Sequence, residues 1–323
     1  MKLRKMTAAG MMDCKKALEE AAGDFQKAIG IIREKGKLVA AKRADRETAE
    51  GAVKVRIKDG KAILVCLGCE TDFVSRNADF QNLADAIADT AIAACPADLE
   101  ALKACKMADG YTVAEAVEAQ TGKTGEKHVV AYYALMEAPY IAQYVHTLTG
   151  KLGAIVGFNK PVSEALGKGI AMQVASMNPV SVSAEDCPAE VLENEKNVAV
   201  QKTKDEMVQK GIDAALKKVG INPAHVDSED HIESNTSKGW LTPEQATQAR
   251  EIIKTVGAEK LASLNMTMIE NIAKGRIQKF LKENTLVEQD YQMSDEKISV
   301  KDAMAKEDGA LKVVSMKRFS LSD

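Results

Sequence analysis

The side chains best placed for redox or metal chemistry are Cys66 and Cys69, which form a CxxC motif in the stretch AILVCLGC. Such a motif cycles between thiol and disulfide when a thiol pKa is lowered, or holds zinc when a second ligand pair is present. Here it lies in and just after an apolar run typical of a buried strand, where odd spacing sends two side chains to opposite faces. We interpret both cysteines as small buried hydrophobic residues and keep a CxxC thiol oxidoreductase as an alternative function.

Other patterns with chemical potential are incomplete. The GKT at residues 122–124 resembles the end of a phosphate-binding loop, but Val117 stands where that motif needs its first glycine. His225 and His231 lie near several acids in a polar segment, where solvated histidines are commoner than metal ligands. No Ser-His-Asp set or paired-carboxylate site is recognisable. The sequence therefore predicts no catalytic residue, no metal site and no cofactor, and a protein that is not an enzyme.

One connection carries an aromatic side chain without an obvious structural purpose. The stretch CETDFVSRN (residues 69–77) separates an apolar run from a helical pattern, with Thr71-Asp72-Phe73-Val74 at its centre. Phe73 either packs onto the following helix or lies exposed at the tip of the connection. The polar residues beside it, Asp72 and Ser75, favour exposure because loops run over the surface. We predict that Phe73 points outwards, where a partner can contact it.

The elements that must position this connection begin with a helical segment at the amino terminus. Asp13 is a suitable N-cap for a helix that stops at Gly23, and Asp24 for a second helix that ends at Gly36. A shorter helical stretch around Leu3 precedes them. The segment is therefore predicted to be a three-helix module, close to the lower size limit for independent folding.

Met11 and Met12 follow Ala-Gly at the predicted turn between two of these helices. One of two consecutive methionines at such a turn can pack inwards, so the other is expected to be exposed. Flexible thioethers are suited to interaction surfaces. We predict that this pair contributes to a binding surface.

A strand–strand–helix unit occurs twice in the sequence. In the first copy, alternation over residues 53–58, the turn Asp59-Gly60 and the apolar run 62–67 predict an antiparallel hairpin whose second strand is central. A helix follows from Asp79 to about Ala94. Such a duplication of strands and helices indicates the α+β class.

In the second copy, YIAQYVHTLTGKLGAIVGF (residues 140–158) predicts two strands joined by a tight glycine-containing turn, and a helix follows over 163–177. The plain turn 159–162 leads into that helix. Because the second copy closes with so short a connection, the length of CETDFVSRN in the first copy exceeds what the fold requires.

The remaining sequence, residues 191–284, is predicted to form a helical arm inserted into the second copy. Thr242 begins a capping box with proline at the first helical position, whereas residues 221–240 have a loop-like composition. The final stretch ALKVVSMKRFSL alternates like a strand and needs a sheet to join. The predicted domains are 1–42 (helical module), 50–138 (first core subdomain), 139–190 plus 285–323 (second core subdomain) and 191–284 (inserted helical arm).

Composition limits the class of protein. The chain has 323 residues, a formal net charge of -3 and 4% aromatic residues, which argues against binding through nucleic-acid phosphates or base stacking. No apolar run approaches the roughly 18 residues of a membrane helix, and no signal-peptide core follows the charged start. The six cysteines are scattered and predict no disulfide framework. We expect a cytoplasmic protein without direct nucleic-acid or membrane contact.

Two motifs resemble a known family. LRKMTAAGMMDCKKALEEAAGDFQKAI is similar to the amino-terminal, ubiquitin-associated-like module of bacterial elongation factor Ts, and CETDFVSRNADF resembles that family's Thr-Asp-Phe-Val signature. The duplicated units look like its two core subdomains. The resemblance covers nearly the whole chain except about 210–262, which is interpreted as an enlargement of the arm. It implies a guanine nucleotide exchange factor for the translational GTPase elongation factor Tu.

The resemblance also implies the residues that contact the GTPase. Thr71, Asp72, Phe73 and Val74 would approach the switch region and disturb the Mg²⁺ held with GDP, with Asp72 and Phe73 at the point of entry. The other contacts implied by the family are Arg4, Met11, Met12, Lys15, Gly125 and His146.

Further features of the family bear on its assembly. Some members dimerise through the region that the arm resembles, so homodimerisation through this arm stays open. Some members also continue into a carboxy-terminal helix that contacts the partner. This chain stops at Asp323, so the resemblance leads us to expect that contact to be absent. Apart from the resemblance, an adaptor that binds through its helical module is the other alternative function.

Overall fold

The computed structural model describes residues 2–7 and 9–322; Met1, Ala8 and Asp323 lie outside the described residues. The predicted α+β class is confirmed, with two three-stranded antiparallel sheets among the described residues. The chain divides into two compact units. One consists of Met1–Val182 with Leu286–Asp323, and the other is Ser183–Thr285.

Three helices stand at the amino terminus: α1 (Lys2–Thr7), α2 (Met11–Glu20) and α3 (Phe25–Lys42). They share a small core that includes Leu3, Ala17 and Ala28. Asp24 caps α3, as predicted, by accepting hydrogen bonds from the amides of Gln26 and Lys27.

Two predicted details of this segment are wrong. Asp13 does not cap α2, because that helix already begins at Met11 after Gly10, and the Asp13 carboxylate instead pairs with Lys35 of α3. The third helix also does not end at Gly36 but runs on to Lys42. Gly36 sits inside α3 where this helix crosses another, and a Cβ added to Gly122 of that helix would lie 2.9 Å from the Gly36 Cα.

The first sheet has the order β1 (Glu50–Lys58), β2 (Lys61–Cys69), β3 (His128–Glu137). Asp59 and Gly60 form the predicted two-residue hairpin, with φ of 51° and 73°. The strand β3 was not expected from the sequence. It pairs with β2 and makes that strand central, as predicted.

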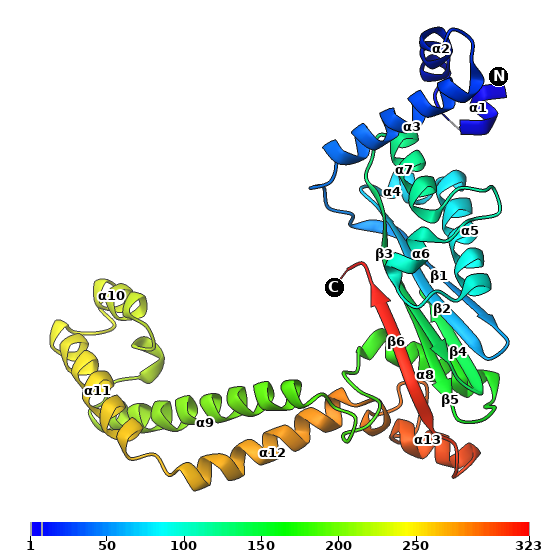
Figure 1. The fold of residues 1–323 in the computed structure, drawn as a ribbon. Coiled ribbons are helices and arrows are strands. Elements are labelled where there is room, and N and C mark those ends of the chain that lie inside the picture. Colours follow the sequence, from blue (N-terminus) through cyan, green and yellow to red (C-terminus); the bar gives the residue numbers. More distant parts are fainter. Residues whose placement is uncertain (1, 8, 323) are drawn as a thin grey trace. The chain divides into compact units, whose positions relative to one another are not determined.

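Helices follow β2 before the chain returns as β3: α4 (Asp72–Ser75), α5 (Ala78–Ala94), α6 (Leu99–Ala104) and α7 (Val113–Thr124). In Figure 1, α5, α6 and α7 lie together beside the first sheet.

The two faces of β2 supply two different cores. Because side chains alternate along a strand, Ile63, Val65 and Leu67 point towards the helices, where Phe80 and Ile87 are buried. Ala62, Leu64 and Cys66 point the other way and pack with residues of the second sheet such as Ile155. This double burial explains the continuous apolar run of β2.

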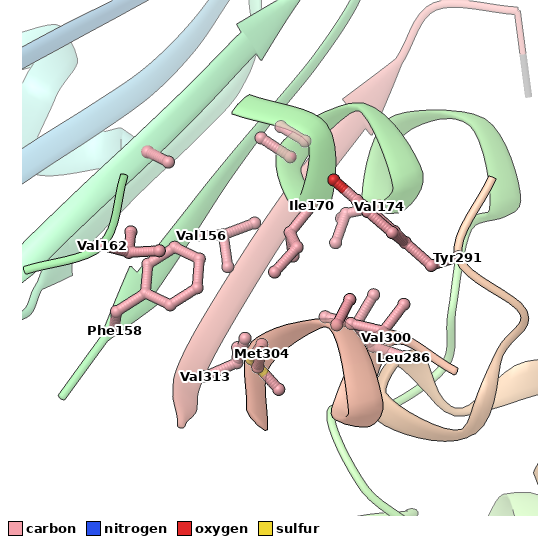
Figure 2. Packing of buried hydrophobic residues seen from close by; sticks show 14 of the residues in the cluster. Val156, Phe158, Val162, Ile170, Val174, Leu286, Tyr291, Val300, Met304 and Val313 are labelled. Carbon is pink, nitrogen blue, oxygen red and sulfur yellow. The ribbon is translucent and has the colours of Figure 1, made fainter. Parts of the chain in front are cut away.

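The second sheet has the order β4 (Tyr140–Val145), β5 (Leu152–Phe158), β6 (Val313–Ser320). The strand expected at the end of the chain is thus confirmed and pairs with β5. The helices α8 (Glu164–Met177) and α13 (Val300–Glu307) accompany this sheet; α13 was not expected. Figure 2 shows Val156 and Phe158 of β5 converging with Ile170 and Val174 of α8 and with Met304 of α13.

The turn between β4 and β5 is not tight, contrary to expectation. Six residues, 146–151, connect the strands. The loop is closed by its own hydrogen bonds: the Gly150 amide donates to the His146 carbonyl at 2.7 Å, and His146 Nδ1 lies 3.0 Å from Thr149 Oγ1. The loop's length exposes Leu148 at its tip.

The second unit contains α9 (Ala189–Lys218), a 3-10 helix η1 (Pro223–His225), α10 (Glu229–Ser237), α11 (Pro243–Ala262) and α12 (Met266–Asn284). Figure 1 shows α9 and α12 running side by side. The capping box at Thr242 is confirmed. The segment 221–240 is not simply a loop, because Ser228 caps α10 within it. A short 3-10 helix, η2 (Leu286–Glu288), returns the chain to the first unit.

Candidate functional site

The connection between β2 and α5 folds into a single helical turn. α4 comprises Asp72–Ser75, with Thr71 at its N-cap position. Phe73 is 85% exposed, as predicted, whereas Val74, the next residue, is partly buried against the core beneath α5. The turn therefore holds one apolar residue as an anchor and presents the adjacent one to solvent.

Ser75 fixes the end of this turn and is not an exposed polar residue as expected. It is buried, its hydroxyl donates to the Asp72 carbonyl at 3.1 Å, and its own carbonyl accepts from the side-chain amide of Gln81 at 2.6 Å. Asn77 then caps α5 by accepting from the Asp79 amide. The exposed tip is thereby attached firmly to the helix that follows.

Thr71 fixes the start of the turn. Its amide and its hydroxyl both donate to the carboxylate of Glu126, at 3.1 and 2.7 Å. The carboxylate of Asp72 lies 3.3 Å from the guanidinium of Arg76, one turn later, at a largely exposed position. Such an exposed pair contributes little stability, so Asp72 is free to exchange this partner for another.

A polar cleft of about 590 Å³ lies beside the tip. It brings together two predicted site residues, Asp72 of α4 and His146 of the β4–β5 loop. Arg76 also lines the cleft, as does Leu148, which is 91% exposed in the β4–β5 loop. Two protruding apolar residues, Phe73 and Leu148, thus stand on the two segments that border this cleft.

The remaining predicted residues lie on other elements. Arg4 is exposed on α1, and Lys15 is exposed on α2, 3.8 Å from Glu19. Met11 and Met12 form the first turn of α2 and are 65% and 61% exposed. Among the described residues, none of α1 or α2 lines the cleft. The exposed residues of α1 and α2 therefore form a second candidate surface besides the cleft.

Gly125 terminates α7. Its φ of 74° lies in the left-handed region, which glycine adopts without the strain that a Cβ would cause. The conformation turns the chain from α7 towards β3 and places Glu126 opposite Thr71. Gly125 thus has a structural function in the arrangement of the tip.

The two cysteines of the CxxC motif are buried core residues. Cys66 and Cys69 are fully buried and belong to different cores, one on each face of the first sheet. Burial raises the pKa of both thiols, and that of Cys69 reaches about 12, with the nearby Glu126 adding to the effect. Reactive cysteines need the opposite shift, so this geometry does not favour thiol oxidoreductase chemistry.

His128 is a buried polar residue that the sequence did not single out. Its Nδ1 is 2.9 Å from the Glu126 carbonyl, which makes Nδ1 the donor, and its Nε2 is buried without a partner against the ring of Phe80. Burial lowers its pKa below the ordinary 6.5, while Glu126 and Glu70 partly oppose that change. His128 is therefore held in the neutral form near pH 7.

The patterns that the sequence left incomplete lie in the following structural settings. The GKT at 122–124 is the last turn of α7 and not a phosphate-binding loop. His225 lies against Trp240, and His231 pairs with Asp227. Within residues 2–7 and 9–322 no cluster of three metal-ligating side chains is found. No helix in the described part of the chain is long and apolar enough to cross a membrane.

The sequence missed the residues that hold the tip. Glu126 accepts a hydrogen bond from Thr71. Glu70 accepts from Arg43 and from the amide of Lys127. The partners in each of these contacts lie far apart in the sequence. The only local signal was a glycine followed by charged residues between a helix and an apolar stretch, in the stretch TGEKHVV. That pattern does not reveal its partner.

Comparison with known proteins gives the family to which this sequence is similar. The family model described as Elongation factor TS matches residues 70–323. Elongation factor Ts of Bacteroides fragilis is 53% identical over 320 residues, covering 99% of this chain and 96% of the relative. The Bacteroides thetaiotaomicron protein of that name is 51% identical and the Porphyromonas gingivalis one 36%, each with the same coverage.

These matches place the chain among the elongation factors of protein biosynthesis. Within that class, the chain belongs to the elongation factor Ts family. Because the matched relatives cover 99% of the chain, their similarity extends over residues 210–262 as well.

Proposed function

We propose that this protein is a guanine nucleotide exchange factor that binds the translational GTPase elongation factor Tu and promotes release of GDP. The observation that carries the proposal is the exposure of Phe73 on a turn held at both ends, by Thr71 and by Ser75. A large aromatic side chain held in solvent is suited to bind a partner, because aromatic side chains bury a large area at an interface. Membership of the elongation factor Ts family supports elongation factor Tu as the partner that Phe73 contacts.

The tip has the chemistry needed to disturb a nucleotide site. GTPases hold GDP together with Mg²⁺, which bridges phosphate and protein oxygens. Phe73 is the apolar wedge that displaces a switch element of the GTPase. Asp72 is a carboxylate that disturbs the groups around the Mg²⁺ ion. Thr71 and Val74 hold the wedge in place. His146 and Gly125 complete this contact.

The second surface supplies affinity. Met11 and Met12, with Arg4 and Lys15 as flanking cations, form an exposed apolar pair suited to a partner surface. An exchange factor only has to bind the nucleotide-free GTPase better than the loaded one, because linkage then weakens nucleotide binding by the same factor. In this proposal the protein acts in the cytoplasm, catalyses no chemical reaction and needs no cofactor. It contacts neither a membrane nor nucleic acid directly. Homodimerisation through the arm is a separate question for experiment.

Replacement of Phe73 and Asp72 by alanine tests the proposal. We expect the double variant to keep its fold, because both side chains project from the core, and to slow GDP release at least tenfold, the loss of roughly 1.4 kcal/mol or more of contact energy. Stopped-flow release of a fluorescent GDP analogue from elongation factor Tu measures this. Trp240→Ala, which removes another exposed aromatic side chain from the second unit, is the matched control. An unchanged rate in the double variant would refute the proposal.

A further inference from the structure

The tip is held by a carboxylate that is distant in sequence. The Glu126 side chain accepts from the Thr71 amide through Oε2 and from the Thr71 hydroxyl through Oε1. Thr71 occupies the N-cap position of α4, yet its hydroxyl makes no cap hydrogen bond. The hydroxyl that would ordinarily satisfy the helix is engaged by Glu126 instead, which joins the tip to the α7–β3 connection.

The backbone that carries Glu126 is itself fixed. The Glu126 amide donates to Thr124 Oγ1 at 3.1 Å, and its carbonyl accepts from His128 Nδ1 at 2.9 Å. The His128 amide donates to the hydroxyl of the buried Thr121 at 3.1 Å. The carboxylate therefore projects from a loop that is tied to both α7 and β3.

A second carboxylate fastens the residue before Thr71. Glu70 accepts from the amide of Lys127 at 2.6 Å and from the guanidinium of Arg43 at 3.0 and 3.1 Å. The ammonium of Lys127 donates to the carbonyls of Ala44 and Arg46. The same short connection, residues 125–127, thus holds the tip and the segment that follows α3.

We infer that Glu126 is a positioning residue for nucleotide exchange, fixing the direction in which Asp72 and Phe73 are presented to the GTPase. This inference rests on the proposed function. Because Phe73 is 85% exposed, its direction depends mainly on the turn that carries it. When the wedge is ordered before binding, Asp72 and Phe73 meet the partner in the geometry that acts on the nucleotide site, so its loss lowers the rate of release within the complex.

Variants at both ends of the contact test the inference. Glu126→Ala removes the carboxylate, and Thr71→Val removes the hydroxyl with little change in shape, whereas Thr71→Ser retains it. We expect Glu126→Ala to lower the maximal rate of GDP release at saturating exchange factor about tenfold, with little change in the concentration for half-maximal rate. Thr71→Val should lower the rate in the same direction, and Thr71→Ser should restore it.

A double-mutant cycle separates positioning from direct contact. If Glu126 acts through Thr71, the double variant loses less than the product of the two single effects; independent, multiplicative losses would overturn the inference. Amide hydrogen exchange provides a readout that needs no GTPase. Residues 71–76 should lose protection in Glu126→Ala while α5 keeps it, and equal loss in both would indicate a general structural role and overturn the inference.

Two controls make the outcomes distinguishable. Glu137→Ala removes an exposed glutamate from the far end of β3, where it pairs with Lys61, and should leave exchange unchanged. Phe73→Ala is measured in parallel. If Phe73→Ala slows release and Glu126→Ala does not, the positioning inference alone fails. If Phe73→Ala has no effect either, the proposed function fails with it.

Discussion

At the scale of single residues, neighbouring side chains in the tip have opposite environments. Phe73 is exposed, Val74 packs against the core and Ser75 is buried in hydrogen bonds. A helical turn separates consecutive side chains by about 100°, so one turn suffices to anchor two residues and present a third. The connection is therefore longer than a plain turn because it builds a small rigid element.

His128 makes the stability of the fold depend on pH in a range where the carboxylates such as Glu70 do not. Its pKa is lowered by burial in the folded state, so below about pH 6.5 the unfolded chain binds a proton that the folded chain does not, and stability falls by at most about 1.4 kcal/mol per pH unit. Glu70, whose pKa is lowered first by the Lys127 amide, loses its contribution only as the pH falls below its ordinary value of 4.5. The pH range in which His128 begins to lower stability therefore lies above the range in which Glu70 does.

We therefore expect the free energy of unfolding to decrease between pH 6.5 and 5 in the parent protein and to decrease less in His128→Asn, whose side-chain amide can still donate to the Glu126 carbonyl. Urea denaturation across this pH range measures both slopes. Equal slopes in the two proteins would assign the pH dependence to other groups.

At the scale of elements, the packing of α3 on α7 depends on a glycine of α7, Gly122, which faces Gly36 of α3. A Cβ added to Gly122 of α7 would lie 2.9 Å from the Cα of Gly36, whereas one added to Gly36 would find its nearest neighbour at an ordinary 3.6 Å. The crossing therefore tolerates a methyl group on one helix only. This close approach explains why α3 continues through Gly36.

Gly122→Ala should separate the two helices and destabilise the protein by about 1–3 kcal/mol, as overpacking does. Gly36→Ala, the matched change on the other helix, should be neutral or stabilise by up to about 1 kcal/mol, because alanine favours the helix. Thermal denaturation followed by circular dichroism compares them. The explanation is wrong if the two variants shift the midpoint alike.

At the scale of the whole molecule, the proposed function divides the work between two surfaces of one unit. In that proposal the methionines of α2, which are exposed, supply affinity, and the tip beside the cleft acts on the nucleotide site. Since the carboxylate of Asp72 is proposed to act on the surroundings of Mg²⁺, its effect depends on that ion being bound to the GTPase.

Removal of Mg²⁺ should therefore diminish the role of the tip. With the ion chelated, GDP leaves the GTPase faster without help, and we expect the difference in release rate between the parent protein and Asp72→Ala to shrink several-fold relative to millimolar Mg²⁺. The same fluorescent GDP assay, run with and without chelator, measures this. A difference that persists without Mg²⁺ would show that Asp72 acts by another route.

The sequence by itself determined the features that depend on local order. Alternation and the Asp59-Gly60 turn predicted the first hairpin, the apolar run predicted a central β2, and the polar neighbours of Phe73 predicted its exposure. Each follows from contacts or solvation within a few residues, which a periodic pattern records. The α+β class follows from the sum of such patterns.

Only the tertiary structure decided how the tip is held. Thr71 and Glu126 are 55 positions apart, and nothing in the composition of either segment identifies the other. Long-range packing also decided that α3 continues past Gly36 and that β3 joins β2. A helix end or a strand pairing depends on what lies across the fold, so local sequence signals yield there to contacts that form only when the chain is compact.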